Sequence, residues 1–163
     1  MTGLFARAAK AIKHGGYVVD IGSGIRPQTL VRADRMLCIE PHGAYAERIE
    51  ADGHTVLRAT ALEGLQQIDV ADTVVMLDVI EHMDKADGQA ALELARLKAR
   101  QIVLFTPLGF MPQHGDAWGL GGEDWQQHRS GWEPEEFEGW KILVDSTFHA
   151  RQGFGAFFAI WGK

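Results

Sequence analysis

The sequence predicts an α/β fold built on a mostly parallel sheet, and three observations lead to it. Short apolar runs alternate with segments of helical periodicity over the first 106 residues, which is the pattern of a doubly wound sheet. Two β-rich runs near the carboxyl end are close enough in sequence to pair as an antiparallel hairpin. The 163 residues, 46% of them hydrophobic, suit one compact domain. We therefore expect a single domain over residues 1–163, a three-layer sandwich around a seven-stranded sheet with a C-terminal antiparallel hairpin.

The expected strands of the parallel part are short apolar runs bounded by glycines or acids, the kind that is buried on both faces of a sheet. They comprise residues 17–21, 35–40, 54–59, 72–78 and 101–106. The hairpin strands are expected over residues 141–149 and 154–162, after one short helix within residues 133–140.

Helices are expected between these strands. Apolar residues at helical spacing predict one over about residues 3–13, and Pro27 suits the first turn of another over roughly 27–33. A third is expected over residues 43–51. A fourth begins near Asp84, with acids placed to cap its start. The residues expected to form the core face of that fourth helix are Ala90, Leu94 and Leu97.

Residues 107–132 differ from the rest, because they combine glycines, prolines and three tryptophans without clean periodicity. A loop of this length is uncommon in a compact domain and is more often a functional lid than an accident. We expect it to emerge from the fifth strand and to cover a ligand there. The alternative is that its tryptophans only fix the loop to the domain.

Composition limits the classes of function. A net charge of -6 argues against nucleic acid as the main partner, because binding to phosphates favours a basic face. The one cysteine, Cys38, excludes an internal disulfide and a zinc site made of cysteines alone, and its apolar neighbours predict a core position. The apolar run at the amino end is too short for a signal peptide or a membrane span. We expect a cytoplasmic protein with no membrane partner, and the oligomeric state stays open.

The segment "VVDIGSGIRPQ" at residues 18–28 predicts a ligand-binding turn, since Gly22 and Gly24 allow close approach of the backbone. A dinucleotide loop would place a third glycine where Pro27 stands. Asp20 before the turn would repel a pyrophosphate and attract an ammonium group. The loop therefore favours a ligand that is cationic near the turn. A plain turn, with its glycines used for packing, is the alternative.

Glu40 follows about 20 residues later, at the end of the next strand. From that position an acid accepts hydrogen bonds from two ribose hydroxyls. A solvated acid at a strand end is the alternative, but the spacing from the glycine loop favours the ligand.

Three segments, "VVDIGSG", "CIEPH" and "VVMLDVIEHM", resemble successive motifs of the class I S-adenosylmethionine-dependent methyltransferases. The expected strand order is similar too, and the resemblance extends from about residue 15 to the end. It implies a Rossmann-like fold, S-adenosyl-L-methionine as cofactor, and methyl transfer. The positions that it implies for cofactor binding are Asp20, Gly22, Ser23, Gly24, Glu40, Pro41, Thr60, Ala61, Leu62, Asp78 and Val79.

The same resemblance implies a role for several of these positions. Asp20 would lie near the amino group of the methionine moiety, Glu40 would bind the ribose, and Asp78 would border the reacting methyl. The chain departs from the family where members often place an acid for the adenine amino group, because Thr60 stands there. Backbone groups after it would then hold adenine, so we expect weaker adenine discrimination.

Three histidines are candidates for a catalytic base, because an unperturbed histidine titrates near neutrality: His82, His114 and His128. His82 has an alternative role in anchoring the helix that follows it. The expected acceptor is a small molecule, with a sugar or natural-product hydroxyl as one candidate, because aromatic and polar residues mix in the loop.

No metal is expected at the site. His114, Asp116 and His128 are conceivable ligands, but their spacing is unlike that of zinc sites, and methyl transfer needs only alignment of the acceptor. Two other functions stay open. One is a non-catalytic module that binds S-adenosylmethionine or a partner, and the less favoured one is an NAD-dependent oxidoreductase.

Overall fold

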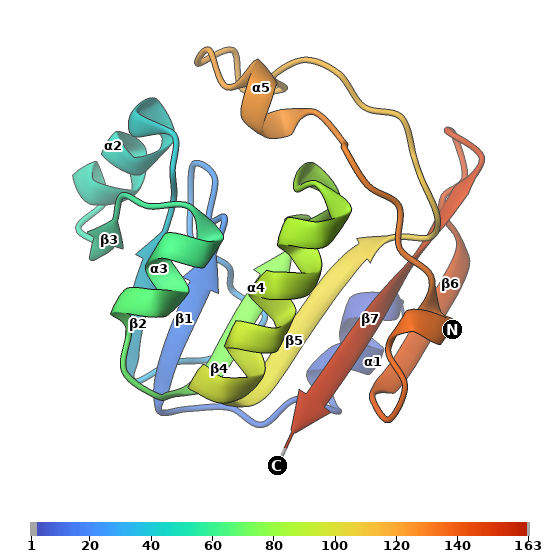
Figure 1. Cartoon of the computed structure of the whole chain (residues 1–163), viewed down its shortest axis with the longest axis horizontal. Helices are drawn as coiled ribbons and strands as arrows, with labels where there is room; N and C mark the ends of the chain where they lie inside the picture. The colour runs from blue at the N-terminus through green and yellow to red at the C-terminus, as the bar shows by residue number, and fades with distance from the viewer. Residues whose placement is uncertain (1–2, 163) are drawn as a thin grey trace.

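The computed structural model describes residues 3–162 and confirms the predicted architecture (Figure 1). Seven strands form one sheet in the order β3-β2-β1-β4-β5-β7-β6. The strands are β1 (Tyr17–Ile21), β2 (Arg35–Ile39), β3 (Val56–Leu57), β4 (Ala71–Leu77), β5 (Ala99–Pro107), β6 (Lys141–His149) and β7 (Phe154–Gly162). The α-helices are α1 (Leu4–Ala9), α2 (Gly43–Ala51), α3 (Ala61–Gln67), α4 (Lys85–Lys98) and α5 (Glu123–Gln126). Two short 3-10 turns are η1 (Ile80–His82) and η2 (Pro134–Glu136).

The directions of the strands place the carboxyl ends of the parallel strands along one edge of the sheet. β1 pairs in parallel with both β2 and β4, and β5 continues the parallel part beside β4. β7 runs antiparallel to β5 and to β6, so it is the second strand of the predicted hairpin that pairs with the parallel part of the sheet. The carboxyl ends of the parallel strands therefore share the edge over which residues 107–132 cross (Figure 1).

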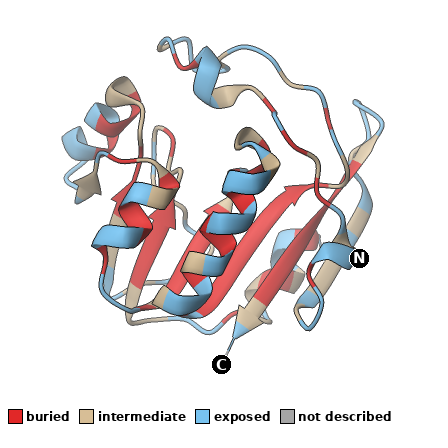
Figure 2. Cartoon of the chain, viewed as in Figure 1, coloured by how far each residue is buried: buried red, intermediate tan, exposed pale blue. Residues whose placement is uncertain are grey.

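Two apolar layers enclose the central strands. On one side α3 and α4 cover the sheet, with Leu65 and Ala95 fully buried, and on the other side α1 contributes Ala8. The middle of the sheet is almost entirely buried, while β6 at the edge contains only exposed and half-buried residues (Figure 2). Such burial on both faces explains why the parallel strands read as continuous apolar runs. Cys38 is a buried core residue, as predicted.

The helix predicted over residues 27–33 is wrong. Gln28 instead closes an irregular turn, because its side-chain oxygen accepts from the Val31 backbone N–H and its amide nitrogen donates to the Val31 carbonyl. These two bonds satisfy the backbone groups locally, which removes the need for a helical turn.

Two other elements are shorter than predicted. The first helix is shorter, ending at Ala9, and β3 has only two residues. α4 begins at its predicted N-cap, Asp84, although no side-chain capping bond forms there. Its predicted core face is correct only for Leu94, which is half-buried against the core, while Ala90 is exposed and Leu97 is 73% exposed. The buried residues of α4, which face the sheet, are small or apolar: Gly88, Ala91, Leu92 and Ala95.

Among residues 3–162, no helix combines the length and the apolar character that crossing a bilayer requires.

Candidate functional site

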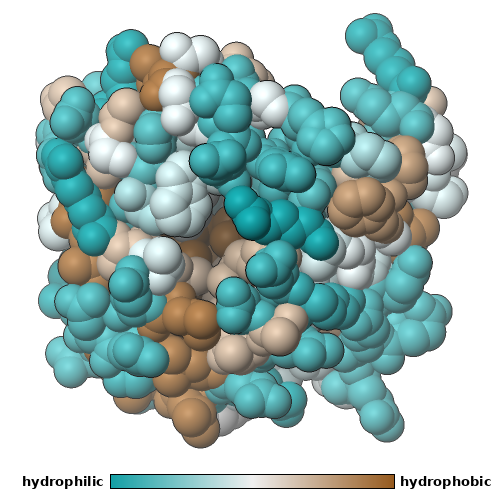
Figure 3. All heavy atoms as spheres, turned by 45° about the horizontal axis from the view of Figure 1, so that its top comes forward, coloured by the Kyte–Doolittle hydropathy of each residue, from teal (hydrophilic) through white to brown (hydrophobic). Residues whose placement is uncertain are grey.

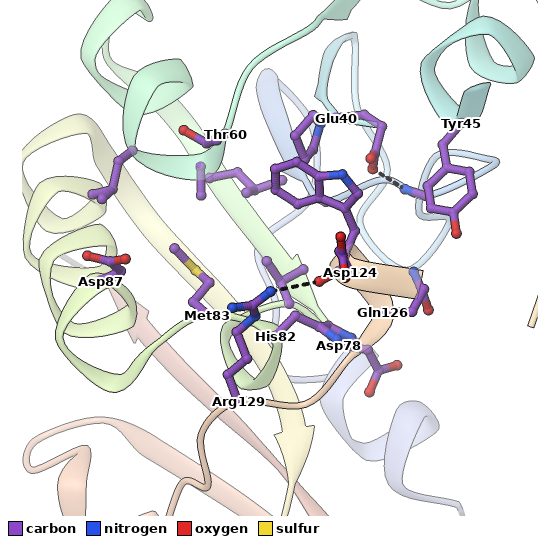
Figure 4. A pocket seen from close by; sticks show the side chains of 18 of the residues that line it. Glu40, Tyr45, Thr60, Asp78, His82, Met83, Asp87, Asp124, Gln126 and Arg129 are labelled. Atoms are coloured by element: carbon purple, nitrogen blue, oxygen red, sulfur yellow. Dashed lines mark hydrogen bonds between the residues drawn. The ribbon is translucent and has the colours of Figure 1, made fainter. Parts of the chain in front are cut away.

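A cavity of 380 Å³ opens at the carboxyl ends of the parallel strands (Figure 4). The segment that carries α5 crosses this edge of the sheet (Figure 1). Open α/β sheets bind ligands at this edge. Figure 3 looks onto this face, where hydrophilic side chains surround a hollow with apolar residues in its depth. The predicted cofactor residues that line the cavity are Gly22, Gly24, Glu40, Pro41, Thr60, Ala61, Leu62, Asp78 and Val79.

The glycine loop that follows β1 depends on the absence of side chains at two positions. Gly22 and Gly24 have φ angles of +65° and +62°, which other residues rarely adopt. A β-carbon at Gly22 would lie 2.8 Å from the side chain of Val79. The loop thus follows a path that only glycine allows, directly against the wall of the cavity.

Asp20 lies under this loop and is only 2% exposed. Its Oδ2 accepts hydrogen bonds from Ser23 Oγ at 2.8 Å and from the Gln28 backbone N–H at 2.9 Å. Burial raises the pKa of Asp20 to about 6, and these hydrogen bonds oppose the rise only in part. Asp20 and Ser23 line a second cavity next to the first, so they are the two predicted cofactor residues outside the 380 Å³ cavity.

Glu40, at the end of β2, joins its strand to the glycine loop. Its Oε2 accepts from the Gly24 backbone N–H at 2.8 Å, and its Oε1 accepts from the His42 N–H at 2.9 Å. Burial raises the pKa of the Glu40 carboxyl, while these two bonds lower it. The carboxyl is fixed in orientation and lines the cavity (Figure 4).

Thr60 stands where class I methyltransferases often have an acid for adenine, and in this chain it has a structural role. It is the N-cap of α3, where its Oγ1 accepts from the Glu63 backbone N–H and the Glu63 carboxylate accepts from the Thr60 N–H. This reciprocal pair is a capping box. Ala61 and Leu62 follow it along the cavity wall.

The second cavity, of 1020 Å³, meets the first at Asp78 and His82, which line both. It is bounded by the glycine loop on one side and by loop residues 111–128 on the other. His149, from the end of β6, closes it on the hairpin side. Its walls mix apolar groups with several polar side chains, which is typical of sites for small molecules.

Two of the three candidate histidines come together at this junction. The rings of His82 and His128 lie 4.7 Å apart, inclined by 73°. Nδ1 of His82 is 3.3 Å from the Gln127 carbonyl oxygen, and Nδ1 of His128 bonds to the Met111 carbonyl oxygen. Burial lowers the pKa of His82 to about 4, so this ring is neutral near pH 7. His114, the third candidate, is exposed and lines neither cavity.

Glu81 is a residue of the site that the sequence analysis missed. It is only 2% exposed; its Oε2 accepts from Thr106 Oγ1 at 3.0 Å, and its Oε1 has no hydrogen-bond partner. Burial raises the pKa of Glu81 and, to about 6, that of Asp78. The charge of Asp78 raises the pKa of Glu81 further, and a hydrogen bond between the two carboxyls raises the pKa of Glu81 and lowers that of Asp78. Asp78 has a φ of +53°, an uncommon conformation that is often found at functional sites. The signal in the sequence was the second acid of "DVIEH".

The tryptophans of residues 107–132 divide between the two roles considered for them. Trp132 is 2% exposed and donates from Nε1 to Ser130 Oγ at 2.9 Å, while Ser130 Oγ donates to the Ile80 carbonyl. This tryptophan fixes the loop to the domain. Trp125 instead lines the 380 Å³ cavity, and Trp118 lies against Gly24.

No family model matches this chain, and no curated protein is significantly similar to it in sequence. Many solved structures, however, share its fold. TehB from Haemophilus influenzae superposes with a TM-score of 0.66 at 11% identity, over 100% of this chain and 63% of that one. The chain has the class I methyltransferase fold.

Two other solved structures of this fold, both described as methyltransferases, differ in size. A SAM-dependent methyltransferase from Archaeoglobus fulgidus gives a TM-score of 0.62 at 15% identity, over 95% of this chain and 90% of that one. The small RNA methyltransferase HEN1 gives 0.63 at 16% identity, over 98% of this chain. The chain spans only a quarter of the length of that HEN1 structure, since 25% of it is covered. The methyltransferase fold therefore occurs in chains that differ widely in length.

Proposed function

We propose that this chain binds S-adenosyl-L-methionine and transfers its methyl group to a small-molecule acceptor. The observation that carries the proposal is that nine of the eleven residues implied for cofactor binding line one cavity at the strand ends, and the other two line the cavity that joins it. Chance placement of residues so far apart in the sequence would not gather them there.

The arrangement suggests an orientation for the cofactor. Adenine would lie by Ala61 and Leu62, and the ribose hydroxyls would donate to the Glu40 carboxylate, whose orientation two backbone N–H groups already fix. The methionine end would extend toward Asp20, where a buried carboxyl favours a cationic partner. The methyl group would then lie near Asp78, where the two cavities meet.

The acceptor would enter through the second cavity. The sulfonium is itself a strong electrophile, so the main task of the protein is to hold the acceptor atom in line with the methyl group. His82 and His128 line this cavity, and a neutral imidazole there can take a proton from an acceptor hydroxyl. We propose these two histidines as the candidates for a base, ahead of the exposed His114.

A small acceptor is favoured over a nucleic acid. HEN1 carries the name of a small RNA methyltransferase, but this chain has a net charge of -6 and its second cavity is bounded by loop residues 111–128. Nucleic-acid binding requires neutralisation of phosphates by basic groups. A hydroxyl of a sugar or of a natural product is the acceptor class that we propose.

Methyl transfer is tested by incubating the protein with S-adenosylmethionine labelled in its methyl group and a panel of hydroxyl, amine and carboxylate acceptors. The proposal expects label in at least one hydroxyl compound and much less with the His82→Gln variant. Label in RNA but not in small molecules would contradict the acceptor class. Tight binding of S-adenosylhomocysteine without transfer to any compound would favour the non-catalytic binding module.

A further inference from the structure

The geometry points to a divalent-cation site formed by Glu81, His82 and His128. We propose that it binds a metal such as Zn²⁺ or Mn²⁺ when residues 107–132, which carry His128, are folded as in this structure. The ligand atoms that these three residues offer all lie within 4.8 Å of one another. Neither spacing nor composition indicates this site, because His128 reaches the other two only through the path of residues 107–132. It differs from the set His114, Asp116 and His128 considered from the sequence, and it does not depend on methyl transfer. With a metal bound, neither His82 nor His128 would be free to act as the base proposed above.

The two imidazoles are oriented as metal ligands usually are. Nδ1 of His82 and of His128 each lies against a backbone carbonyl, of Gln127 and Met111 respectively. A carbonyl oxygen only accepts, so Nδ1 carries the proton of each neutral ring and Nε2 keeps a free lone pair. Metal-binding histidines commonly show this bond from the second nitrogen to a carbonyl, which fixes the tautomer and the ring.

Glu81 supplies the anionic ligand. Its Oε1 is buried and has no partner, although the residue is only 2% exposed. A buried carboxylate without a partner is costly, and either a proton or a cation must compensate it. Neither Glu81 nor its neighbour Asp78 belongs to the ion pairs found among residues 3–162, which join Arg58 to two glutamates, Lys85 to Glu136 and Arg100 to Asp72. None of these pairs therefore brings a basic side chain to the two carboxyls, so either a proton shared between them or a bound cation offsets their charge.

The backbone holds the three residues in register. The Glu81 carbonyl accepts from the N–H groups of Arg129 and Ser130, at 2.7 and 3.1 Å, directly after His128. Ligands about 2.0–2.2 Å from one zinc ion lie no more than about 4.4 Å apart, so small side-chain rotations would close the site. Two histidines and one glutamate are a ligand set of catalytic zinc sites, which keep a position open for water or a substrate oxygen. That open position would lie where Asp78 and His82 border both cavities.

The test measures metal binding directly, not activity. Protein stripped with a chelator is titrated with Zn²⁺ by calorimetry and with Co²⁺ by visible absorption, because Co²⁺ reports the ligand geometry. The proposal expects one equivalent to bind to the native chain and to the His114→Ala variant, which removes an exposed histidine of the same loop. Glu81→Gln, His82→Ala and His128→Ala are expected to weaken binding by more than about 100-fold, since changes in residues behind the ligands already cost 10- to 100-fold.

A His128→Cys variant keeps a ligand at the site and guards against misfolding of the alanine variants. It is expected to bind Co²⁺ with a new thiolate charge-transfer band that is absent from the native chain. Failure of the native chain to bind either ion, equal affinity in all variants, or Co²⁺ binding to His128→Cys without that band would each overturn the proposal. Binding of S-adenosylhomocysteine to the same stripped protein tests the methyltransferase function separately.

Discussion

The indole of Trp118 lies against Gly24, so closely that a β-carbon built at position 24 would be 2.5 Å from the ring. The Trp118 ring also meets Tyr45 edge-on, with ring centroids 4.9 Å apart. Residues 107–132 thus contact the glycine loop directly. Trp118 can lie where it does only because position 24 has no side chain. The loop and the cofactor motif are one structural unit.

We expect Gly24→Ala to weaken the binding of S-adenosylhomocysteine by at least about tenfold, which equals about 1.4 kcal/mol. The methyl group would meet Trp118, and the φ of +62° would add strain. Gly53→Ala is the matched control, because Gly53 has a φ of +85° but open space around its β-carbon. Calorimetric titration of both variants checks the prediction. Equal affinity in the two would show that the contact at Gly24 does not matter.

Asp20 predicts a pH dependence of stability in the ligand-free protein. Its folded pKa of about 6 lies above the usual aspartate value of 3.8, so between these values the folded chain keeps a proton that the unfolded chain releases. Stability from this group is therefore greatest below about pH 4 and falls as the pH rises through 6, by up to about 3 kcal/mol. Urea unfolding from pH 4 to 7 measures this fall.

Asp20→Asn isolates that contribution, because the amide does not titrate while Glu40, whose charge raises the pKa of Asp20, still does. The difference in unfolding free energy between the native chain and this variant should change over pH 4–6 and be constant above. The native affinity for S-adenosylhomocysteine should rise over the same range, since its ammonium group favours the ionised carboxyl. A pH-independent affinity would argue against contact between Asp20 and that group.

Thr60→Asp should strengthen the binding of S-adenosylhomocysteine, because an acid there could accept from the adenine amino group. Aspartate is also a good N-cap, so α3 should persist despite the nearby Glu63 carboxylate. Circular dichroism checks the helix and calorimetry the affinity. If the folded variant binds S-adenosylhomocysteine no more tightly than the native chain, Thr60 is not the cause of weaker adenine discrimination.

Ser130→Ala should destabilise the chain by about 1–3 kcal/mol, because it leaves the buried Trp132 Nε1–H without its acceptor. Ser146→Ala, at an exposed position of β6, should change the unfolding free energy by less than about 0.5 kcal/mol. Chemical denaturation of both variants compares them. Equal stabilities would mean that the hydrogen bond does not anchor the loop.

The parts of the fold that depend on local patterns could be predicted. Strands such as Tyr17–Ile21 are mostly apolar because both of their faces are buried, and strand ends such as Glu40 could be located from them. The core face of α4 could not be predicted, because alanines and Gly88 fill it while the larger Leu97 faces solvent.

The junction of the two cavities was less accessible to sequence reasoning. His128 meets His82 only because two backbone bonds join the segment after it to the Glu81 carbonyl. A loop without periodicity gives no signal for such long-range contacts. Glu81 stands out because it is buried and its Oε1 has no hydrogen-bond partner, and neither property can be read from the sequence.

The most direct test of the account is a calorimetric comparison of S-adenosylhomocysteine and NAD as ligands of the native chain. The account predicts that S-adenosylhomocysteine binds with one equivalent and that the Glu40→Ala variant loses this binding, while NAD does not bind. Binding of NAD with no binding of S-adenosylhomocysteine would contradict the assignment of the cavity and favour an oxidoreductase.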